Sequence, residues 1–241
     1  EQKGCKYLEF DISQNFDFEK NIDVVFHLAA LARIQPSIKN PSETLRNNFQ
    51  STLNVLEYAR VNNIPVIYAG SSSKHHGLYG SPYAWSKYSG EQLCKLYSEV
   101  YGLNTSICRF YNVYGPHHIR SGAYATVLGI FERQYLNNEP LTITGTGEQR
   151  RDFTHIDDIV SGLLSCVGKE HKAEEFELGS GVNYSINELA LIFNSERVYI
   201  PPRPGEYDVT LCDYSKAKKE IGYEPKGDIK KYIKNWLEEN K

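Results

Sequence analysis

The feature that most constrains this sequence is a series of short strand-like runs separated by long amphipathic segments. The runs cover residues 24–30, 64–69 and 104–110, and each is long enough for one buried strand. Between them, residues 42–62 and 83–101 repeat apolar side chains at helical spacing. Buried strands that alternate with helices of this length are typical of a doubly wound parallel sheet, so the predicted fold class is α/β.

The second half of the sequence is less regular, but its patterns still predict further elements. Helices are expected at 123–137, 155–168, 186–194 and 228–240, and further strands at 6–12, 140–144 and 174–178. The stretch 201–206 is rich in Pro and Gly and is expected to be a loop.

Composition excludes several classes of function. The 241 residues include 27 Lys and Arg against 30 Asp and Glu, a net charge of −3, which argues against a nucleic-acid or membrane-surface protein. No apolar run approaches the roughly 20 residues of a membrane span, and no secretory signal is visible. The cysteines are far apart and lack metal-ligand spacing, so we expect reduced thiols and a cytoplasmic location: Cys5, Cys94, Cys108, Cys166 and Cys212.

The sharpest chemical signal is the pair Tyr83 and Lys87. Residues four apart share one face of a helix. A Tyr normally titrates near ~10, and a neighbouring cation lowers its pKa, so the pair could take a proton from an alcohol. Such a pair also occurs by chance on exposed helices, so the pattern alone leaves both interpretations open.

Hydroxyl side chains follow directly after the strand predicted at 64–69. Residues 70–73 read Gly-Ser-Ser-Ser, and ligands of open α/β sheets bind at the carboxyl ends of the strands. A serine here could hold a substrate hydroxyl beside Tyr83. The alternative is a serine-rich turn that only caps the strand.

Ordered sequence blocks give the chain a family resemblance. It resembles the extended short-chain dehydrogenase/reductases and, within them, the nucleotide-sugar epimerases of the UDP-glucose 4-epimerase type. The blocks are FDI at 10–12, VVFHLAA at 24–30, NNFQSTLNVLEYAR at 47–60, the serines at 71–73, SPYAWSK at 81–87, RFYNVYGP at 109–116, GTGEQRRDFTHIDDI at 145–159 and RPGE at 203–206. Each block is weak alone, but their order and spacing together are specific.

The resemblance implies roles for individual residues. Those implied to be catalytic are Ser72, Tyr83 and Lys87, with Ser71 and Ser73 as neighbours of the first. Those implied to line the cofactor are Asp11, Ile12, Leu28, Ala29, Ala30, Asn48, Tyr83, Lys87 and Tyr111. Those implied to bind the nucleotide sugar are Ser72, Asn112, Thr142, Thr144, Arg151, Arg203 and Thr210. Arg forks suit a diphosphate because they bind phosphate oxygens bidentately.

The resemblance also implies an activity and an architecture. It implies an NAD-dependent 4-epimerase of UDP-hexoses, in glucose/galactose or N-acetyl forms, acting through a 4-keto intermediate. The fold would be a Rossmann-like sheet, truncated at its N-terminus, with a smaller α/β substrate-binding region. The dinucleotide-binding part would cover 1–113, rejoined by about 154–180, and the sugar-binding part 114–153 and 181–241. Relatives dimerise through the helices expected here at 42–62 and 83–101.

The sequence departs from the family at its beginning. It starts at what corresponds to the third strand of the family, so roughly 45–55 residues, or two βα units, are expected to be missing. Those residues would hold the Gly-rich turn that binds the pyrophosphate. We therefore expect this chain alone to bind NAD poorly and to expose an apolar sheet edge. The choice of NAD over NADP is only the family default.

Two further departures concern the sugar pocket. Residues 74–77 read Lys-His-His-Gly, where relatives usually have an apolar residue and a Tyr before the Gly. Thr210 stands where several relatives that act on non-acetylated sugars have a Tyr, so a smaller gate could admit an N-acetyl group.

Other interpretations of these residues remain open. Arg150, Arg151 and Asp152 could be a surface ion-pair cluster, and the acidic residues 157–158 suit the first turn of a helix better than a metal site. The pair 75–76 of His residues lacks further ligands, and no metal is expected.

Two other functions are alternatives. A dehydratase or decarboxylase of the same family is disfavoured because residues 72–74 read Ser-Ser-Lys, where dehydratases have Thr-Asp-Glu. A non-catalytic nucleotide-sugar-binding protein is the alternative outside enzymes.

Overall fold

The computed structural model describes residues 4–14, 16 and 21–240, apart from the side chain of His76. In this part of the chain, parallel strands form a sheet in the order β1 (Val25–His27), β2 (Val66–Ser71), β3 (Thr105–Phe110) and β7 (Glu174–Leu178). The structure thereby confirms the α/β class and the parallel sheet.

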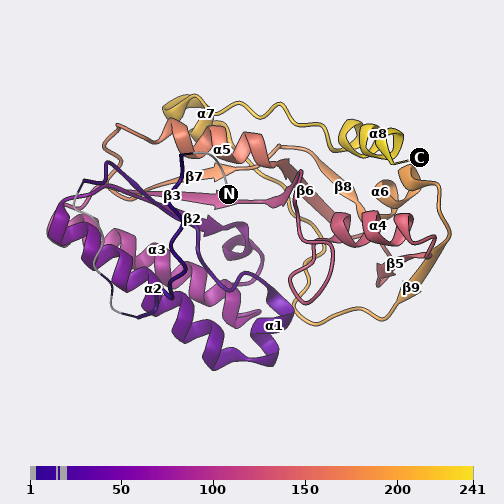
Figure 1. The fold of residues 1–241 in the computed structure, drawn as a ribbon, viewed down its shortest axis with the longest axis horizontal. Coiled ribbons are helices and arrows are strands. Elements are labelled where there is room, and N and C mark those ends of the chain that lie inside the picture. The colour runs from indigo at the N-terminus through magenta and orange to yellow at the C-terminus, as the bar shows by residue number, and fades with distance from the viewer. Residues whose placement is uncertain (1–3, 15, 17–20, 241) are drawn as a thin grey trace.

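Helices cover both faces of this sheet. In Figure 1, α2 (Pro41–Asn62) and α3 (Pro82–Tyr101) lie below it, and α5 (Ile156–Ser165) and α7 (Ser215–Ile221) lie above it. Successive strand residues point to opposite faces, so Tyr68 packs among residues of α2 and α3 while Ile67 packs against α5. Each face buries its own apolar cluster, which is the main stabilising contribution.

Local sequence signals fix the position of α3. Ser81 caps its first turn by accepting a hydrogen bond from the amide of Ala84 at 3.1 Å, and Pro82 follows at the first helical position. At Gly90 an added Cβ would lie 2.1 Å from the Tyr68 hydroxyl oxygen. The helix can therefore approach β2 closely only because Gly90 has no side chain.

A second region lies to the right in Figure 1. Its strands are β4 (Asn112–Tyr114), β6 (Arg150–His155) and β8 (Asn183–Ser185) in one sheet and β5 (Leu141–Thr144) and β9 (Arg197–Ile200) in another. The helices α4 (Val127–Leu136), α6 (Ile186–Phe193) and α8 (Ile229–Glu239) share one apolar cluster with β4, β5 and β6. The short helices α1 (Ile34–Lys39) and η1 (Ser72–His76) complete the described elements.

The strand expected at 6–12 is wrong. Residues 5–11 have no regular structure, and Tyr7 and Leu8 are exposed, at 79% and 55%. A strand forms only where a neighbour satisfies its backbone groups, and the described residues offer none to this segment. The sequence also missed β4, β6, β8 and β9, which are short or rich in charged residues.

Two kinds of feature are absent from the described residues. None of their helices combines the length and apolar character that a membrane crossing needs. Their His, Cys, Asp and Glu side chains form no group of three or more that could hold a metal ion.

Candidate active site

A tyrosine and a serine hydroxyl meet at the carboxyl end of β2. The hydroxyl of Tyr83, in the first turn of α3, donates to the Oγ of Ser71 at 3.4 Å, and Ser71 and Ser73 Oγ lie 2.8 Å apart. The resemblance implies Ser72 for this position, but the serine that contacts Tyr83 is Ser71, the residue before it. Ser72 is half-buried and begins η1 directly beside this contact.

Lys87 lies one turn after Tyr83 and is buried. Its Nζ lies 4.4 Å from the centre of the Tyr68 ring. Burial lowers the pKa of Lys87 to about 8, against the opposing effect of the Glu91 carboxylate. At neutral pH the ammonium form therefore still dominates.

A cation that the sequence did not indicate lies near Tyr83. Burial raises the pKa of Tyr83, while the hydrogen bond to Ser71 and the charge of Arg33 lower it. Arg33 thus joins Lys87, the cation that the sequence predicts for this role. The Arg33 guanidinium is held by its Nε and Nη2, which donate to the carbonyl of Tyr124 at 3.0 and 2.7 Å.

Ser37 is a second residue that sequence reasoning missed. It is buried, and its Oγ accepts from the amide of Tyr83 at 3.1 Å and donates to the carbonyl of Ile34 at 2.7 Å. This hydroxyl joins α1 to the start of α3 and fixes the backbone of Tyr83. The sequence signal that could have indicated them is the spacing of Arg33 and Ser37, four residues apart, shortly after the strand at 24–30.

The residues implied to line a cofactor surround the end of β1. Leu28 and Ala29 directly follow this strand and are exposed, although both are apolar. Asn48 is buried and holds the next turn, accepting from the amide of Leu31 at 2.8 Å and donating to its carbonyl at 3.2 Å. An apolar turn held rigid at the carboxyl end of a parallel strand fits a dinucleotide, and Ala30 lies half-buried within it.

The other implied cofactor residues differ in exposure. Asp11 is exposed, and its Oδ1 accepts from the amide of Ser13 at 2.9 Å. Ile12 is held on α2 by its carbonyl, which accepts from Asn54 at 3.0 Å. Tyr111 is buried at the end of β3, and its hydroxyl donates to Glu177 at 3.2 Å.

The implied diphosphate and gate residues meet between β4 and β6. Asn112 Nδ2 donates to the carbonyl of Asp152 at 3.0 Å and lies 3.4 Å from the Oγ1 of Thr210. Thr210 is buried, and its Oγ1 also accepts from the amide of Asp152 at 3.0 Å. In this structure the Thr210 hydroxyl contacts both the side chain of Asn112 and the backbone of Asp152.

The implied cations and threonines are spread over the second region. Arg151 Nη1 donates only to backbone carbonyls of 150 and 208, at 3.0 and 3.4 Å, among its described contacts, and burial lowers its pKa. Arg203 is exposed in the loop before β-bridge residue Val209. The Thr142 hydroxyl accepts from Gln134 on α4 at 2.8 Å, and Thr144 lies half-buried two residues on.

Two charged groups left open by the sequence have structural contacts. Arg150 donates to the side chain and carbonyl of Asn183, both at 2.9 Å, so it differs from its neighbour Arg151. Asp158 is buried and accepts from the amides of 226 and 227 at 2.8 Å each.

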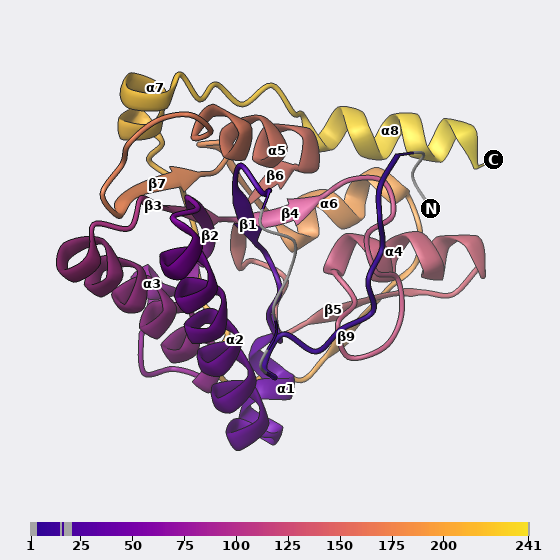
Figure 2. The ribbon, with the colours of Figure 1, turned by 60° about the vertical axis from the view of Figure 1, so that its left-hand side comes forward.

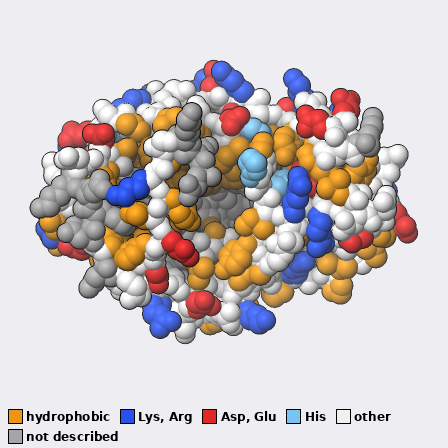
Figure 3. Space-filling model, in the orientation of Figure 1, with side chains coloured by type: hydrophobic (Ala, Val, Ile, Leu, Met, Phe, Trp, Pro, Cys, Tyr) orange, Lys and Arg blue, Asp and Glu red, His pale blue; other side chains and the backbone are white. Residues whose placement is uncertain are grey.

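The surface between the two regions is hollowed. Figure 3 shows a hollow near the middle of the face drawn in Figure 1, bordered by hydrophobic side chains. Lys and Arg side chains gather on its right-hand side, toward β5 and β9. Cations beside an apolar hollow are suited to an anionic ligand with an apolar ring.

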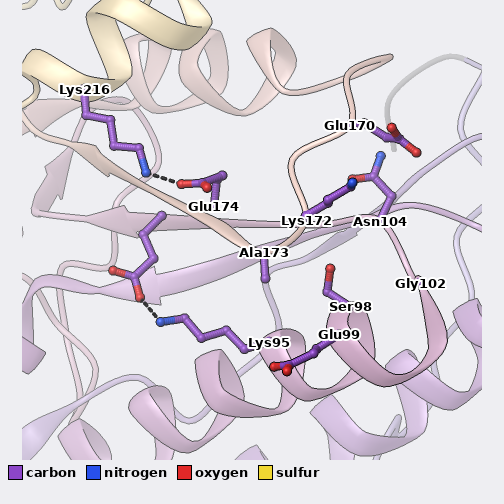
Figure 4. A pocket seen from close by; sticks show the side chains of 11 residues that line it. Lys95, Ser98, Glu99, Gly102, Asn104, Glu170, Lys172, Ala173, Glu174 and Lys216 are labelled. Atoms are coloured by element: carbon purple, nitrogen blue, oxygen red, sulfur yellow. Dashed lines mark hydrogen bonds and ion pairs between the residues drawn. The ribbon is translucent and has the colours of Figure 1, made fainter.

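A separate groove of about 740 Å³ lies at the opposite edge of the sheet, near the starts of β3 and β7 (Figure 4). Two of the lysines that line it are already paired: Lys95 Nζ lies 2.6 Å from Glu175, and Lys216 contacts Glu174. This groove is remote from the carboxyl ends of the strands, so it is not a candidate for the reaction site.

Comparisons with known proteins agree with this arrangement. The UDP-glucuronate 4-epimerase of Thermodesulfobacterium geofontis is 34% identical over 99% of this chain and 81% of its own length. An epimerase structure from Methanothermobacter thermautotrophicus matches with a TM-score of 0.91 and 30% identity over 100% of this chain and 80% of that one. A Bacillus cereus UDP-glucuronic acid 4-epimerase, solved with UDP-glucuronic acid and NAD, gives 0.82 at 27% identity, covering 91% and 76%.

A family model leads to the same conclusion. The model described as the NAD dependent epimerase/dehydratase family matches residues 5–179, which is well over half of the chain. That match includes β1, β2, α3 and the contact between Tyr83 and Ser71. The chain therefore belongs to the NAD dependent epimerase/dehydratase family.

Proposed function

We propose that this protein is an NAD-dependent 4-epimerase of a UDP-hexose, acting through a 4-keto sugar. The observation that carries the proposal is the contact of the Tyr83 hydroxyl with Ser71 at the carboxyl end of β2. Lys87 is buried one helical turn away, and Arg33 supplies a second cation. Together these groups can remove and return the proton of a sugar hydroxyl.

Each side chain has a distinct task in this scheme. Tyr83, as phenolate, accepts the proton of the sugar 4-hydroxyl, and the serine cluster at 71–73 orients that hydroxyl. Lys87 and Arg33 stabilise the negative charge on Tyr83. NAD, when bound, supplies the acceptor and donor of the C4 hydride. The groups proposed to hold it are Asp11, Ile12, Leu28, Ala29, Ala30, Asn48 and Tyr111.

The nucleotide must stay fixed while the keto sugar turns over to present its other face. We assign that task to Asn112, Arg151 and Arg203, because a diphosphate carries about two negative charges and guanidinium groups bind its oxygens. Thr142 and Thr144 are assigned to the uracil. The two tasks divide the chain into a cofactor part, 1–113 with about 154–180, and a sugar part, 114–153 with 181–241.

We also propose a cytoplasmic homodimer. Reduced thiols suit that compartment, and the described cysteines are free. The proposed interface is formed by α2 and α3, which lie side by side in Figure 2. Leu96 and Val100 of α3 are exposed, at 50% and 59%. Tyr58 and Tyr97 are buried in the core and are therefore not part of that surface.

Variants of the hydroxyl groups test the reaction scheme. Tyr83→Phe removes the proton acceptor and should lower kcat by about 10²–10⁴-fold, as expected for loss of a general base. Ser71→Ala and Ser72→Ala, measured side by side, identify which serine acts. Ser195→Ala, a hydroxyl at the start of the β9 region, is the control and should keep wild-type kcat. Near-normal turnover of Tyr83→Phe would contradict the scheme.

A further inference from the structure

The residues that follow the serine cluster have an unexplained composition. Lys74 and His75 belong to η1, the short helix that begins at Ser72. Nothing in the proposed chemistry uses them. Their nearest charged partners lie on another element, β7, and Lys74 Nζ also lies 4.0 Å from Glu91 of α3.

Both side chains reach across to β7. Lys74 Nζ lies 3.4 Å from Glu175 Oε2, and His75 Nε2 lies 2.7 Å from Glu177 Oε1. The two glutamates are two residues apart on a strand, so they project from the same face of the sheet. The turn that begins with the serine cluster is thus attached at two adjacent points.

The glutamates are themselves anchored by a buried arginine. Arg109 on β3 donates from Nη1 to Glu177 at 2.8 Å, and its Nη2 lies 2.7 Å from Glu175. The same guanidinium binds the fully buried Glu91 of α3, with Nε and Nη2 at 2.9 and 2.8 Å. An anchor this well hydrogen-bonded holds its position, in contrast to the ends of an exposed surface ion pair.

This anchor also touches the backbone next to the serines. At Gly70, an added Cβ would lie 2.8 Å from Glu91 Oε1 and 2.9 Å from the Cγ of Arg109. Gly70 directly precedes Ser71, so one charged cluster packs under the start of the serine turn and is bound to its end. Tyr111, proposed to line the cofactor, donates to the same Glu177.

We propose that Lys74 and His75 are positioning residues that hold the serine turn at the distance from Tyr83 that the reaction needs. This inference rests on the proposed function. A short 3₁₀ turn is a weak structure on its own, so its geometry depends on tertiary contacts. Small misplacements of an orienting group reduce the rate strongly, while binding of the distant nucleotide is unaffected.

A matched pair of lysines tests the proposal. Lys74 and Lys95 both pair with Glu175, Lys95 at the shorter distance of 2.6 Å, but only Lys74 belongs to the serine turn. Lys74→Ala should lower kcat about tenfold with an unchanged KM for the UDP-sugar, as expected for lost orientation. Lys95→Ala should leave both constants within about twofold, because a half-exposed ion pair contributes little.

Conservative variants separate positioning from general structure. Lys74→Arg keeps the charge and should restore kcat to near the wild-type value. His75→Gln keeps a hydrogen-bond donor to Glu177, so its kcat should be higher than that of His75→Ala. If Lys74→Ala and His75→Ala match Lys95→Ala in kcat, the proposal is overturned. If all of these variants show a higher KM together with a lower kcat, the proposal is also overturned, because the effect is then a general structural one.

Hydrogen exchange gives a readout that does not require activity. In the full protein, Lys74→Ala should speed amide exchange across 71–77, and Lys95→Ala should not. A wild-type protein that converts no UDP-sugar would contradict the proposed function. The exchange data would still show whether Lys74 holds the serine turn in place. Unchanged amide exchange over 71–77 in Lys74→Ala would show that Lys74 does not hold this turn, and would overturn the proposal.

Discussion

At the scale of single residues, the environment of Tyr83 determines how the site can work. Burial raises its pKa, so an isolated hydroxyl in this position would stay protonated at neutral pH. The hydrogen bond to Ser71 and the charge of Arg33 act in the opposite direction. The proposed base therefore depends on neighbours from β2 and from the residue before α1.

Removing the charge of Arg33 tests this dependence. Arg33→Gln destabilises the phenolate, so the pKa of Tyr83 rises and the acid limb of the pH profile of kcat moves to higher pH. At a pH below that limb, kcat falls about tenfold for each pH unit of displacement. Arg46→Gln, at an exposed position of α2, is the control and should keep the wild-type profile. An acid limb that stays in place in Arg33→Gln would refute the role of Arg33.

Gly90 allows a second prediction about a single residue. In Gly90→Ala the new Cβ would meet the Tyr68 hydroxyl oxygen at 2.1 Å, so α3 must move away from β2. Overpacking of this kind costs about 1–3 kcal/mol of unfolding free energy. Urea denaturation of the wild type and of Gly90→Ala measures this loss of unfolding free energy.

A double-mutant cycle tests the mechanism of that cost. Tyr68→Leu removes the clashing hydroxyl, so the pair Gly90→Ala and Tyr68→Leu should be less destabilised than the sum of the single variants. Strict additivity would show that the cost of Gly90→Ala has another origin.

At the scale of elements, charged side chains join the serine turn and α3 to β7. Burial alone would raise the pKa of Glu175, but hydrogen bonds from Lys95 and Arg109 and the charges of Arg109 and Lys74 lower it to about 2. A carboxylate with a depressed pKa contributes stability that is present above its ordinary value of 4.5. That contribution is lost as the pH falls from about 4.5 toward about 2.

The acid dependence of stability measures this linkage. In Glu175→Gln the free energy of unfolding should fall less steeply between pH 4.5 and pH 2 than in the wild type, because one titrating group is gone. Glu99→Gln, at an exposed position of α3 that also lines the groove (Figure 4), serves as the control variant. Parallel curves for wild type and Glu175→Gln would contradict the assignment.

At the scale of the whole molecule, exposed apolar side chains on α3 predict the assembly. Leu96→Glu places a charge on the proposed dimer surface and should convert the dimer to a monomer in sedimentation. Leu191→Glu is the matched control, since Leu191 is 59% exposed on α6, and it should leave the dimer intact. A wild-type monomer, or a dimer that survives Leu96→Glu, would count against this interface.

Sequence patterns predicted the parts of the fold with strong periodicity. The strands near 25, 66 and 105 and the helices α2, α3 and α8 are confirmed, because apolar spacing and caps specify them locally. The strand at 6–12 was wrong and β6 was missed, because pairing with a distant neighbour decides both and leaves no periodic signal.

The site was only partly readable for the same reason. Tyr83 and Lys87 are close in sequence, and their shared helical face was predictable. Arg33 and Glu177 reach the site from distant elements, and no local pattern indicates this. Which serine of 71–73 contacts Tyr83 depends on how β2 ends, and sequence spacing does not resolve this; in the structure it is Ser71, while the role of Ser72 stays a prediction.

The most direct test of the central claim is an NMR measurement of the reaction itself. The full protein is incubated with NAD and, in separate samples, with UDP-glucose, UDP-N-acetylglucosamine or UDP-glucuronate, and the anomeric protons are followed. A 4-epimerase produces new signals of the galacto configuration from at least one of these sugars, and Tyr83→Phe does not. Unchanged spectra with every sugar, in a protein with demonstrated NAD binding, would contradict the proposed function.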